Sequence, residues 1–316
     1  MKILANDGIS QSGIDDLTAA GFEVLTTTVA QEQLENFINS ENIVALLVRS
    51  ATTVRQDLID ACPNLKIIGR GGVGMDIIDV EYARKKGLSV INTPAASSES
   101  VAELVFAHLF SGVRFLYDSN RAMPLDGDSK FKALKKAYAK GTELRGKTLG
   151  VIGFGRIGQA TAKMALGLGM KVIAFDPFLE KTTLSLSFYD GQTIDFEIST
   201  VSKETVLKES DFISLHVPAQ KEFVIGKAEL ELMKNGAGLI NAARGGVVDE
   251  VALVSALNSN KLAFAGLDTF ENEPTPSVQL LMNPKISLTP HIGAATNQAQ
   301  DRIGSELASQ IISILK

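Results

Sequence analysis

The chain has 316 residues, of which 45% are hydrophobic and 21% are charged, and its formal net charge is -5 at pH 7. A chain of this length is typically organised into about two domains. The composition is ordinary for a globular protein and excludes collagen-like and intrinsically disordered classes, and the negative charge disfavours a general nucleic-acid binder.

The single cysteine, Cys62, cannot form an internal disulfide, and we expect it to be a buried hydrophobic side chain in a reducing compartment. The amino terminus, MKILANDG, has too short an apolar run for the core of a signal peptide. The longest apolar stretch, residues 101–113, is too short to span a membrane. We therefore expect a cytoplasmic protein without membrane contact. No metal is expected either, because no group of Cys and His residues has metal-ligand spacing.

Strands and helices are predicted to alternate up to residue 91. Short apolar runs predict buried strands, and apolar residues at helical spacing predict the helices between them. This alternation with short connections predicts a parallel sheet covered on both faces, which is a complete small α/β domain. The predicted strands are residues 2–5, 22–26, 43–48, 65–68 and 88–91, and the predicted helices are residues 13–20, 31–39, 56–62 and 80–86.

Thr93 and Pro94 interrupt the alternation, and a long helix predicted over residues 98–117 leads into the next domain. A basic segment follows it. We favour a solvated surface for this segment, because a run of charges needs no further explanation, and keep a positive rim for an anionic substrate as the alternative. Its basic residues are Lys130, Lys132, Lys135, Lys136, Lys140, Arg145 and Lys147.

The stretch LGVIGFGRIGQATAKMALGLGMKVIAFD, residues 149–176, predicts a strand, a glycine turn, a helix and a second strand. Gly153 permits the tight turn, Gly155 lets the backbone approach a pyrophosphate, and Gly158 lets helix and strand pack closely. Asp176 ends the second strand, where a carboxylate accepts hydrogen bonds from a ribose 2′-hydroxyl and repels a 2′-phosphate. The stretch therefore predicts a dinucleotide site that favours NAD over NADP.

The alternation then resumes and predicts a second doubly wound sheet, whose ligands bind beyond the carboxyl ends of the strands. Arg244, Glu273 and His291 stand at such ends. Taken singly, the arginine would be interpreted as a surface ion pair, the glutamate as a solvated loop residue and the histidine as a satisfied polar residue. Their joint occurrence beside a nicotinamide site instead predicts catalysis. His108, on the apolar helix, is instead predicted to be packed and hydrogen-bonded. The segments assigned to this sheet and its helices are residues 211–217, 238–242, 251–257, 263–268 and 286–289.

Several longer motifs are spread over nearly the whole chain. They are VRSAT (48–52), GRGGVGMD (69–76), NTP (92–94), GTELRGKTLGVIGFGRIG (141–158), NAARGGVVDE (241–250), GLDTFENEP (266–274) and PHIGAAT (290–296). In these motifs the chain resembles the D-isomer-specific 2-hydroxyacid dehydrogenases, and within them the D-3-phosphoglycerate dehydrogenase branch. The last three motifs are highly specific to the family.

The resemblance implies two doubly wound parallel-sheet α/β domains. A Rossmann NAD-binding domain, residues 98–292, would be inserted into a smaller flavodoxin-like substrate domain, residues 1–97 and 293–316. The carboxyl-terminal helix would return to the first domain, and substrate and cofactor would bind between the two domains. A homodimer formed through the cofactor domains is also implied.

The resemblance also implies catalytic roles. Arg244 would hold the substrate carboxylate and the C2 oxygen, which suits its planar, two-pronged guanidinium. His291 would take the proton of the C2 hydroxyl as hydride leaves C2 for the nicotinamide, since histidine exchanges protons near neutral pH. Glu273 would hydrogen-bond the other ring nitrogen, fix the tautomer and stabilise the imidazolium.

Further residues follow from the resemblance position by position, and Arg49 is a candidate partner for a substrate phosphate. The substrate side would be lined by Arg49, Ser50, Arg70, Gly71 and Gly72. NAD would be contacted by Val73, Gly153, Gly155, Arg156, Ile157, Gly158, Asp176, Val217, Ala242, Ala243, Arg244, Asp268, His291, Gly293 and Ala294.

The chain departs from the branch in three places. Residues 95–98 replace the Asn-Gly pair that usually follows NTP, and residues 181–200 match no part of the family pattern. The chain also ends at Lys316, directly after the closing helix, so a carboxyl-terminal regulatory domain and feedback inhibition by serine through it are not expected.

Three functions remain open. The first is NAD-dependent oxidation of 3-phosphoglycerate to 3-phosphohydroxypyruvate, the entry to serine biosynthesis. The second is a glyoxylate or hydroxypyruvate reductase, which differs from the first at the phosphate. The third is an NAD-sensing corepressor that binds partner proteins, against which the presence of Arg244, Glu273 and His291 argues.

Overall fold

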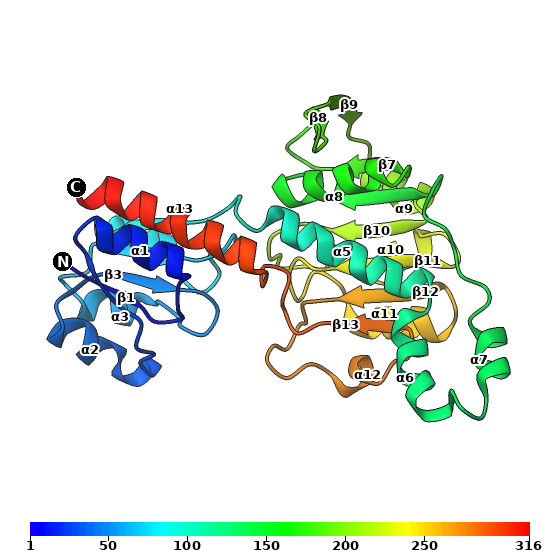
Figure 1. Cartoon of the computed structure of the whole chain (residues 1–316), viewed down its shortest axis with the longest axis horizontal. Coiled ribbons are helices and arrows are strands. Elements are labelled where there is room, and N and C mark those ends of the chain that lie inside the picture. Colours follow the sequence, from blue (N-terminus) through cyan, green and yellow to red (C-terminus); the bar gives the residue numbers. More distant parts are fainter. The chain divides into compact units, whose positions relative to one another are not determined.

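The structure is a computed structural model that describes residues 1–316. The chain divides into two compact units, one formed by residues 1–100 and 294–316 and the other by residues 101–293. Both are α/β units built on parallel sheets, as the sequence predicts (Figure 1). No helix is both long and apolar enough to cross a membrane.

The first unit contains a five-stranded sheet in the order β2-β1-β3-β4-β5, and every neighbouring pair is parallel. Apolar residues run continuously through the inner strands, because a parallel sheet is buried on both faces. The strands are β1 (Lys2–Ala5), β2 (Glu23–Leu25), β3 (Ile43–Val48), β4 (Ile67–Arg70) and β5 (Ser89–Asn92).

Helices cover both faces of this sheet, and the carboxyl-terminal helix α13 (Asn297–Leu315) lies along α1 (Gln11–Ala19), as Figure 1 shows. Two glycines allow this close approach, since a Cβ on Gly13 would lie 2.9 Å from Gly304 Cα. The remaining helices of the unit are η1 (Gln31–Gln33), α2 (Leu34–Ser40), α3 (Gln56–Ala61) and α4 (Val80–Lys85).

Cys62 follows α3 and lies in the hydrophobic core beneath it. Burial raises the pKa of its thiol to about 11, so it is protonated near neutral pH. The expectation of a buried hydrophobic side chain is confirmed.

The second unit contains a six-stranded parallel sheet in the order β13-β12-β11-β10-β6-β7. Its strands are β6 (Thr148–Ile152), β7 (Lys171–Phe175), β10 (Phe212–Leu215), β11 (Ala237–Asn241), β12 (Leu262–Leu267) and β13 (Ile286–Leu288). Its helices after β6 are α8 (Arg156–Gly167), α9 (Lys203–Glu209), α10 (Lys227–Leu232), α11 (Glu250–Asn258) and α12 (Val278–Leu281).

Each sheet has one switch point, where successive strands are added first on one side of a strand and then on the other. In the first unit, β2 lies on one side of β1 and β3 on the other. In the second unit, β7 lies on one side of β6 and β10 on the other. Ligands of doubly wound sheets bind beyond the carboxyl ends of the strands at such switch points. Each unit therefore has one edge at which a ligand is expected.

The helix predicted over residues 98–117 is confirmed for residues 98–113 and is wrong in extending as one helix through residues 114–117. The observed helix α5 (Ser98–Val113) ends at Val113, Phe115 adopts a left-handed conformation with φ 56°, and α6 (Leu116–Asp126) begins anew. Contacts with distant residues explain the break. The Val113 carbonyl accepts a hydrogen bond from the Thr142 amide, and the ring of Phe115 lies 6.0 Å from that of Tyr138. Local periodicity carries no information on such contacts.

The basic segment forms the short helix α7 (Phe131–Ala137) and the extended chain that follows it. Lys132, Lys135 and Lys136 are exposed on this helix, and Lys130 Nζ lies 3.0 Å from Asp126 Oδ1. In the single chain these lysines are therefore exposed to solvent.

The unplaced segment at residues 181–200 is an antiparallel hairpin of β8 (Lys181–Ser187) and β9 (Thr193–Ser199), seen above α8 in Figure 1. Leu184 pairs with Phe196 across the hairpin and is buried in the core of the second unit. Leu186, two residues further on the same face, is only half-buried. Leu184 is therefore the fully buried apolar anchor of the hairpin, and the partly buried Ile198 of β9 packs against the same core.

We predict that Leu184→Ala lowers the free energy of unfolding by about 2–5 kcal/mol, because it leaves a cavity where a buried side chain packed. Leu186→Ala is the matched control and should cost less. Urea unfolding followed by circular dichroism measures both. Equal losses in the two variants would contradict this account of the anchor.

Candidate active site

The glycine turn follows β6 at the switch point of the second unit. Gly153 has a φ of 90°, and a Cβ there would lie 2.5 Å from the carbonyl oxygen of His216. A Cβ on Gly158 would lie 2.2 Å from the carbonyl oxygen of Gly153. The packing of the protein itself therefore requires these two glycines.

Gly155 differs, because a Cβ there would meet no protein atom within 4 Å. It precedes α8 as the N-cap residue, and no side chain caps this helix. The amide groups at a helix start attract anions, and a bare backbone lets a phosphate approach closely. The turn thus fits the pyrophosphate of a dinucleotide, with Arg156 and Ile157 in the first turn of the helix.

Asp176 follows β7, where it was expected to favour NAD over NADP. Its Oδ2 accepts a hydrogen bond from the Phe154 amide at 2.7 Å, and its Oδ1 accepts one from the Phe178 amide at 2.9 Å. Phe154 lies inside the glycine turn, so the carboxylate also holds this turn in place. Sequence reasoning missed this second role, because it depends on the pairing of β6 with β7.

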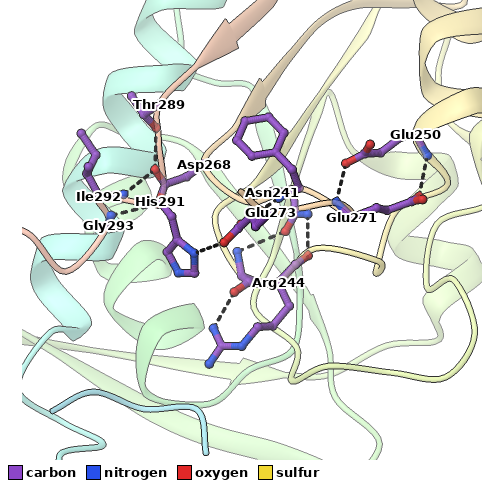
Figure 2. Close-up of polar contacts among 12 residues, drawn as sticks. Asn241, Arg244, Glu250, Asp268, Glu271, Glu273, Thr289, His291, Ile292 and Gly293 are labelled. Carbon is purple, nitrogen blue, oxygen red and sulfur yellow. Dashed lines mark hydrogen bonds and ion pairs between the residues drawn. The ribbon is translucent and has the colours of Figure 1, made fainter. Parts of the chain in front are cut away.

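His291 and Glu273 lie side by side in the second unit (Figure 2). The two atoms His291 Nδ1 and Glu273 Oε2 are 2.8 Å apart. Glu273 Oε1 accepts a hydrogen bond from the Phe270 amide at 3.0 Å. Both carboxylate oxygens are therefore engaged, and the contact with Glu273 uses only one of the two ring nitrogens of His291.

The backbone of His291 is left-handed, with φ 55°, which costs a residue other than glycine about 1–2 kcal/mol. The carboxylate of Asp268 stabilises this turn, because it accepts hydrogen bonds from the amides of Ile292 and Gly293, each at 2.8 Å, and from the Thr289 hydroxyl at 2.6 Å. Asp268 is only 1% exposed. A buried, fully bonded carboxylate thus holds the histidine in position (Figure 2).

His108 extends this network from α5, and the expectation that it is packed and hydrogen-bonded is confirmed. Its Nε2 lies 3.0 Å from Thr289 Oγ1, and its Nδ1 lies 2.9 Å from Ser287 Oγ. Thr289 gives its proton to Asp268, so it accepts from His108 Nε2–H, and Nδ1 accepts from Ser287. Burial lowers the pKa of His108, which suits this neutral tautomer.

Arg244 follows β11. Its carbonyl accepts a hydrogen bond from Asn241 Nδ2 at 2.9 Å, and its Nη1 donates to the Ala243 carbonyl at 2.7 Å. A Cβ on Gly245 would lie 1.8 Å from the Phe270 carbonyl oxygen, so only glycine allows this loop to approach the Glu273 loop so closely. Figure 2 shows Arg244, Glu273 and His291 in one neighbourhood.

Sequence reasoning did not identify a pair of glutamates that joins these two loops. Glu271 Oε1 accepts a hydrogen bond from the Glu250 amide at 3.2 Å, and Glu250 Oε1 accepts one from the Glu271 amide at 2.8 Å (Figure 2). Burial, together with the charges of Glu271 and Glu273, raises the pKa of Glu250. The only sequence signal was an acid at the start of α11, which is ordinary for a helix start.

The remaining residues expected to contact NAD lie in both units. Val217 follows β10, and its Cγ1 would lie 3.1 Å from a Cβ on Gly153. His216 lies beside Val217. Its Nε2 is hydrogen-bonded to the Ser214 hydroxyl, and burial lowers its pKa to about 3. Ala242, Ala243, Asp268 and Gly293 follow strands of the second unit, and Val73 and Ala294 belong to the first.

The residues expected on the substrate side gather at the carboxyl ends of β3 and β4. Arg49 and Ser50 follow β3, and Arg70 ends β4 and donates a hydrogen bond from Nε to the Arg49 carbonyl at 3.1 Å. Gly71 and Gly72 come next, and a Cβ on Gly72 would lie 1.6 Å from Arg70 Nη1. Glycine at this position thus leaves room for the guanidinium.

We predict that Gly155→Ala folds normally but binds NADH roughly tenfold or more weakly, because its methyl group would displace the phosphate from a charge-assisted hydrogen bond worth about 1.5–3 kcal/mol. Gly167→Ala is the matched control, since its Cβ also meets no protein atom and it lies at the far end of the same helix. Fluorescence titration gives the Kd, and thermal unfolding checks the fold. Unchanged binding in Gly155→Ala would count against a pyrophosphate at this turn.

Residues 106–293 match the family model described as D-isomer specific 2-hydroxyacid dehydrogenase, NAD binding domain. The chain is 43% identical over 298 residues to the hydroxypyruvate reductase of Thermotoga maritima, covering 93% of this chain and 91% of that protein. It is 39% identical over 320 residues to the D-3-phosphoglycerate dehydrogenase of Archaeoglobus fulgidus, and it spans 58% of that protein's length and 100% of its own.

A solved structure of D-lactate dehydrogenase from Aquifex aeolicus, complexed with NAD and lactic acid, superposes with a TM-score of 0.75 at 30% identity. The superposition covers 100% of this chain and 95% of that one. The family model spans more than half of the chain and includes the glycine turn, Arg244, Glu273 and His291. The chain therefore belongs to the D-isomer-specific 2-hydroxyacid dehydrogenases and is an NAD-dependent oxidoreductase.

Proposed function

We propose that this protein oxidises 3-phospho-D-glycerate to 3-phosphohydroxypyruvate, the first step of L-serine biosynthesis. The observation that supports this substrate is a pair of arginines at one sheet edge. Arg70 is paired with Val48 in the register of β3 and β4, so it lies beside Arg49. Two guanidinium groups at neighbouring strand ends suit a substrate that carries a phosphate as well as a carboxylate.

The chemistry then divides among three residues. Arg244 binds the substrate carboxylate through its two-pronged guanidinium and orients C2. The proton of the C2 hydroxyl passes to His291 Nε2 as the C2 carbonyl forms, and the Glu273 carboxylate at Nδ1 stabilises the imidazolium. NAD, when bound, accepts the hydride that leaves C2.

We predict that His291→Ala lowers kcat by roughly 10² to 10⁴-fold, the range of general acid and base catalysis. Glu273→Gln should lower kcat by less, because the imidazole remains but loses its charged partner. Glu231→Gln, an exposed glutamate on α10, is the matched control and should have no effect. Stopped-flow measurement of NADH formation tests all three. Full activity in Glu273→Gln would remove Glu273 from the mechanism.

We predict that Arg49→Ala raises KM for 3-phosphohydroxypyruvate roughly tenfold or more, because a charge-assisted hydrogen bond worth about 1.5–3 kcal/mol is lost. KM for hydroxypyruvate, which lacks the phosphate, should change much less. Arg55→Ala serves as control, because Arg55 is exposed and pairs with Asp79 instead. Steady-state kinetics on both substrates decides, and similar losses for both would assign Arg49 a role other than phosphate binding.

A glyoxylate or hydroxypyruvate reductase is the second candidate. The 43% identity to a hydroxypyruvate reductase of similar length favours it. A panel of 2-oxo acids with and without a 3-phosphate, assayed with NADH and with NADPH, separates the candidates by kcat/KM. A corepressor-like binding protein would follow only from lack of turnover on the whole panel.

A homodimer formed through the second unit is also part of the proposal. Its support is the exposed apolar surface of α6 and α7, which a monomer would leave in water. Leu116, Met123, Leu125 and Phe131 have exposed fractions of 53%, 43%, 80% and 56%.

A further inference from the structure

The loop after β1 carries one carboxylate, that of Asp7, on which the loop after β3 depends. Its Oδ2 accepts hydrogen bonds from the amides of Arg49, Ala51 and Thr52, at 2.6, 3.2 and 3.1 Å. Its Oδ1 accepts one from the Thr52 hydroxyl at 2.5 Å. All four donors belong to residues 49–52.

The neighbouring residue Asn6 also holds Thr52 in place. It is 2% exposed, and its Nδ2 donates to Thr52 Oγ1 at 2.8 Å. Its Oδ1 accepts a hydrogen bond from the Val29 amide at 2.8 Å. The Thr52 hydroxyl thus accepts from Asn6 and donates to Asp7, so its orientation is fixed.

The backbone of Arg49 is held on both sides. Its amide donates to Asp7, and its carbonyl accepts from Arg70 Nε at 3.1 Å. When both peptide groups of a residue are bonded, the direction in which its side chain leaves the backbone is set. Asp7 therefore helps to fix the position of the Arg49 backbone and, with it, the direction in which the Arg49 side chain leaves the loop.

The contact between Asp7 and the loop of residues 49–52 lies where a ligand of this sheet is expected. The strand order β2-β1-β3-β4-β5 puts the switch point between β1 and β3, and Asp7 and Arg49 follow these two strands. Ligands of such sheets bind at this point. A loop that is fixed there can present its side chains to a ligand without first losing conformational freedom.

We propose that Asp7 is a positioning residue that holds the loop of residues 49–52 in the conformation in which it binds the anionic substrate. Asp7 does not touch the substrate. The inference rests on the proposed function, since it takes residues 49–52 to be part of the substrate side. Because the loop binds substrate and transition state alike, loss of Asp7 should raise KM far more than it lowers kcat.

The test compares Asp7→Ala and Asp7→Asn with the matched control Asp15→Ala, whose carboxylate accepts only from the exposed Gln11 side chain. In Asp7→Ala, KM for 3-phosphohydroxypyruvate should rise roughly tenfold to hundredfold, the cost of a misplaced binding group. Its kcat and its Kd for NADH should stay near those of the unmodified protein. Asp7→Asn keeps one oxygen for the amides and should recover part of the loss.

A second readout follows the loop itself. Amide hydrogen exchange in a peptide spanning residues 48–53 should be faster in Asp7→Ala than in Asp15→Ala, because three amides lose their acceptor. Faster exchange with an unchanged KM would overturn the positioning role, and so would unchanged exchange. A joint fall of kcat, NADH affinity and Tm would also overturn it, since it would show a merely structural residue.

A separate experiment tests the proposed function. The unmodified protein is assayed first with NADH on 3-phosphohydroxypyruvate, hydroxypyruvate and glyoxylate, and lack of turnover on all three rejects that function. The positioning role of Asp7 needs a test that does not depend on which substrate is turned over. We therefore also measure, in the same samples, how far added substrate slows amide hydrogen exchange in residues 48–53. If substrate protects these amides in the unmodified protein but not in Asp7→Ala, the positioning role is supported, whichever substrate is turned over. If substrate does not protect them in the unmodified protein, that role is rejected.

Discussion

The geometry of the active site depends on one buried carboxylate, that of Asp268. It accepts three hydrogen bonds, from the Thr289 hydroxyl and from the amides of Ile292 and Gly293, and these donors enclose His291 on both sides in the chain. The left-handed backbone of His291 is unfavourable by itself, so it persists because this carboxylate and its donors leave the turn no equivalent alternative. The histidine is thereby held in place by the protein alone, which would preorganise the proton transfer proposed for it.

The same device recurs in both units. Asp7 follows β1 and holds the loop after β3, Asp176 follows β7 and holds the turn after β6, and Asp268 follows β12 and holds the turn after β13. In each case the two strands are neighbours in a parallel sheet. Backbone amides at the carboxyl edge of such a sheet have no strand partner, and an ionised carboxylate is their strongest acceptor. The loops that form the binding edges are therefore fixed by short acidic side chains rather than by packing.

Glycines have a complementary role at the active site. Because they lack a side chain, they let two backbone segments lie closer together than other residues would allow. Gly158 lets α8 pack against the turn after β6, and Gly245 brings the Arg244 loop against the carbonyl of Phe270. Gly155 differs because no protein atom lies near its missing side chain. The contrast separates the glycines that the fold requires from the one that the fold does not require and that we expect to face NAD. Spacing in the sequence treats all of them alike.

The sequence by itself determined the alternation of strands and helices, the glycine turn and the candidate trio Arg244, Glu273 and His291, because periodicity and residue type at strand ends are local properties. Only the tertiary structure decided the break at Phe115, the packing of Leu184 from the hairpin into the core, the Glu250 and Glu271 pair and the loop contacts of Asp7 and Asp176. Each of these depends on which strands become neighbours or which distant side chains meet. The pairing of strands is set by burial of the whole sheet. A residue such as Asp7, whose partner Arg49 lies 42 positions away, has no local sequence pattern that indicates the contact.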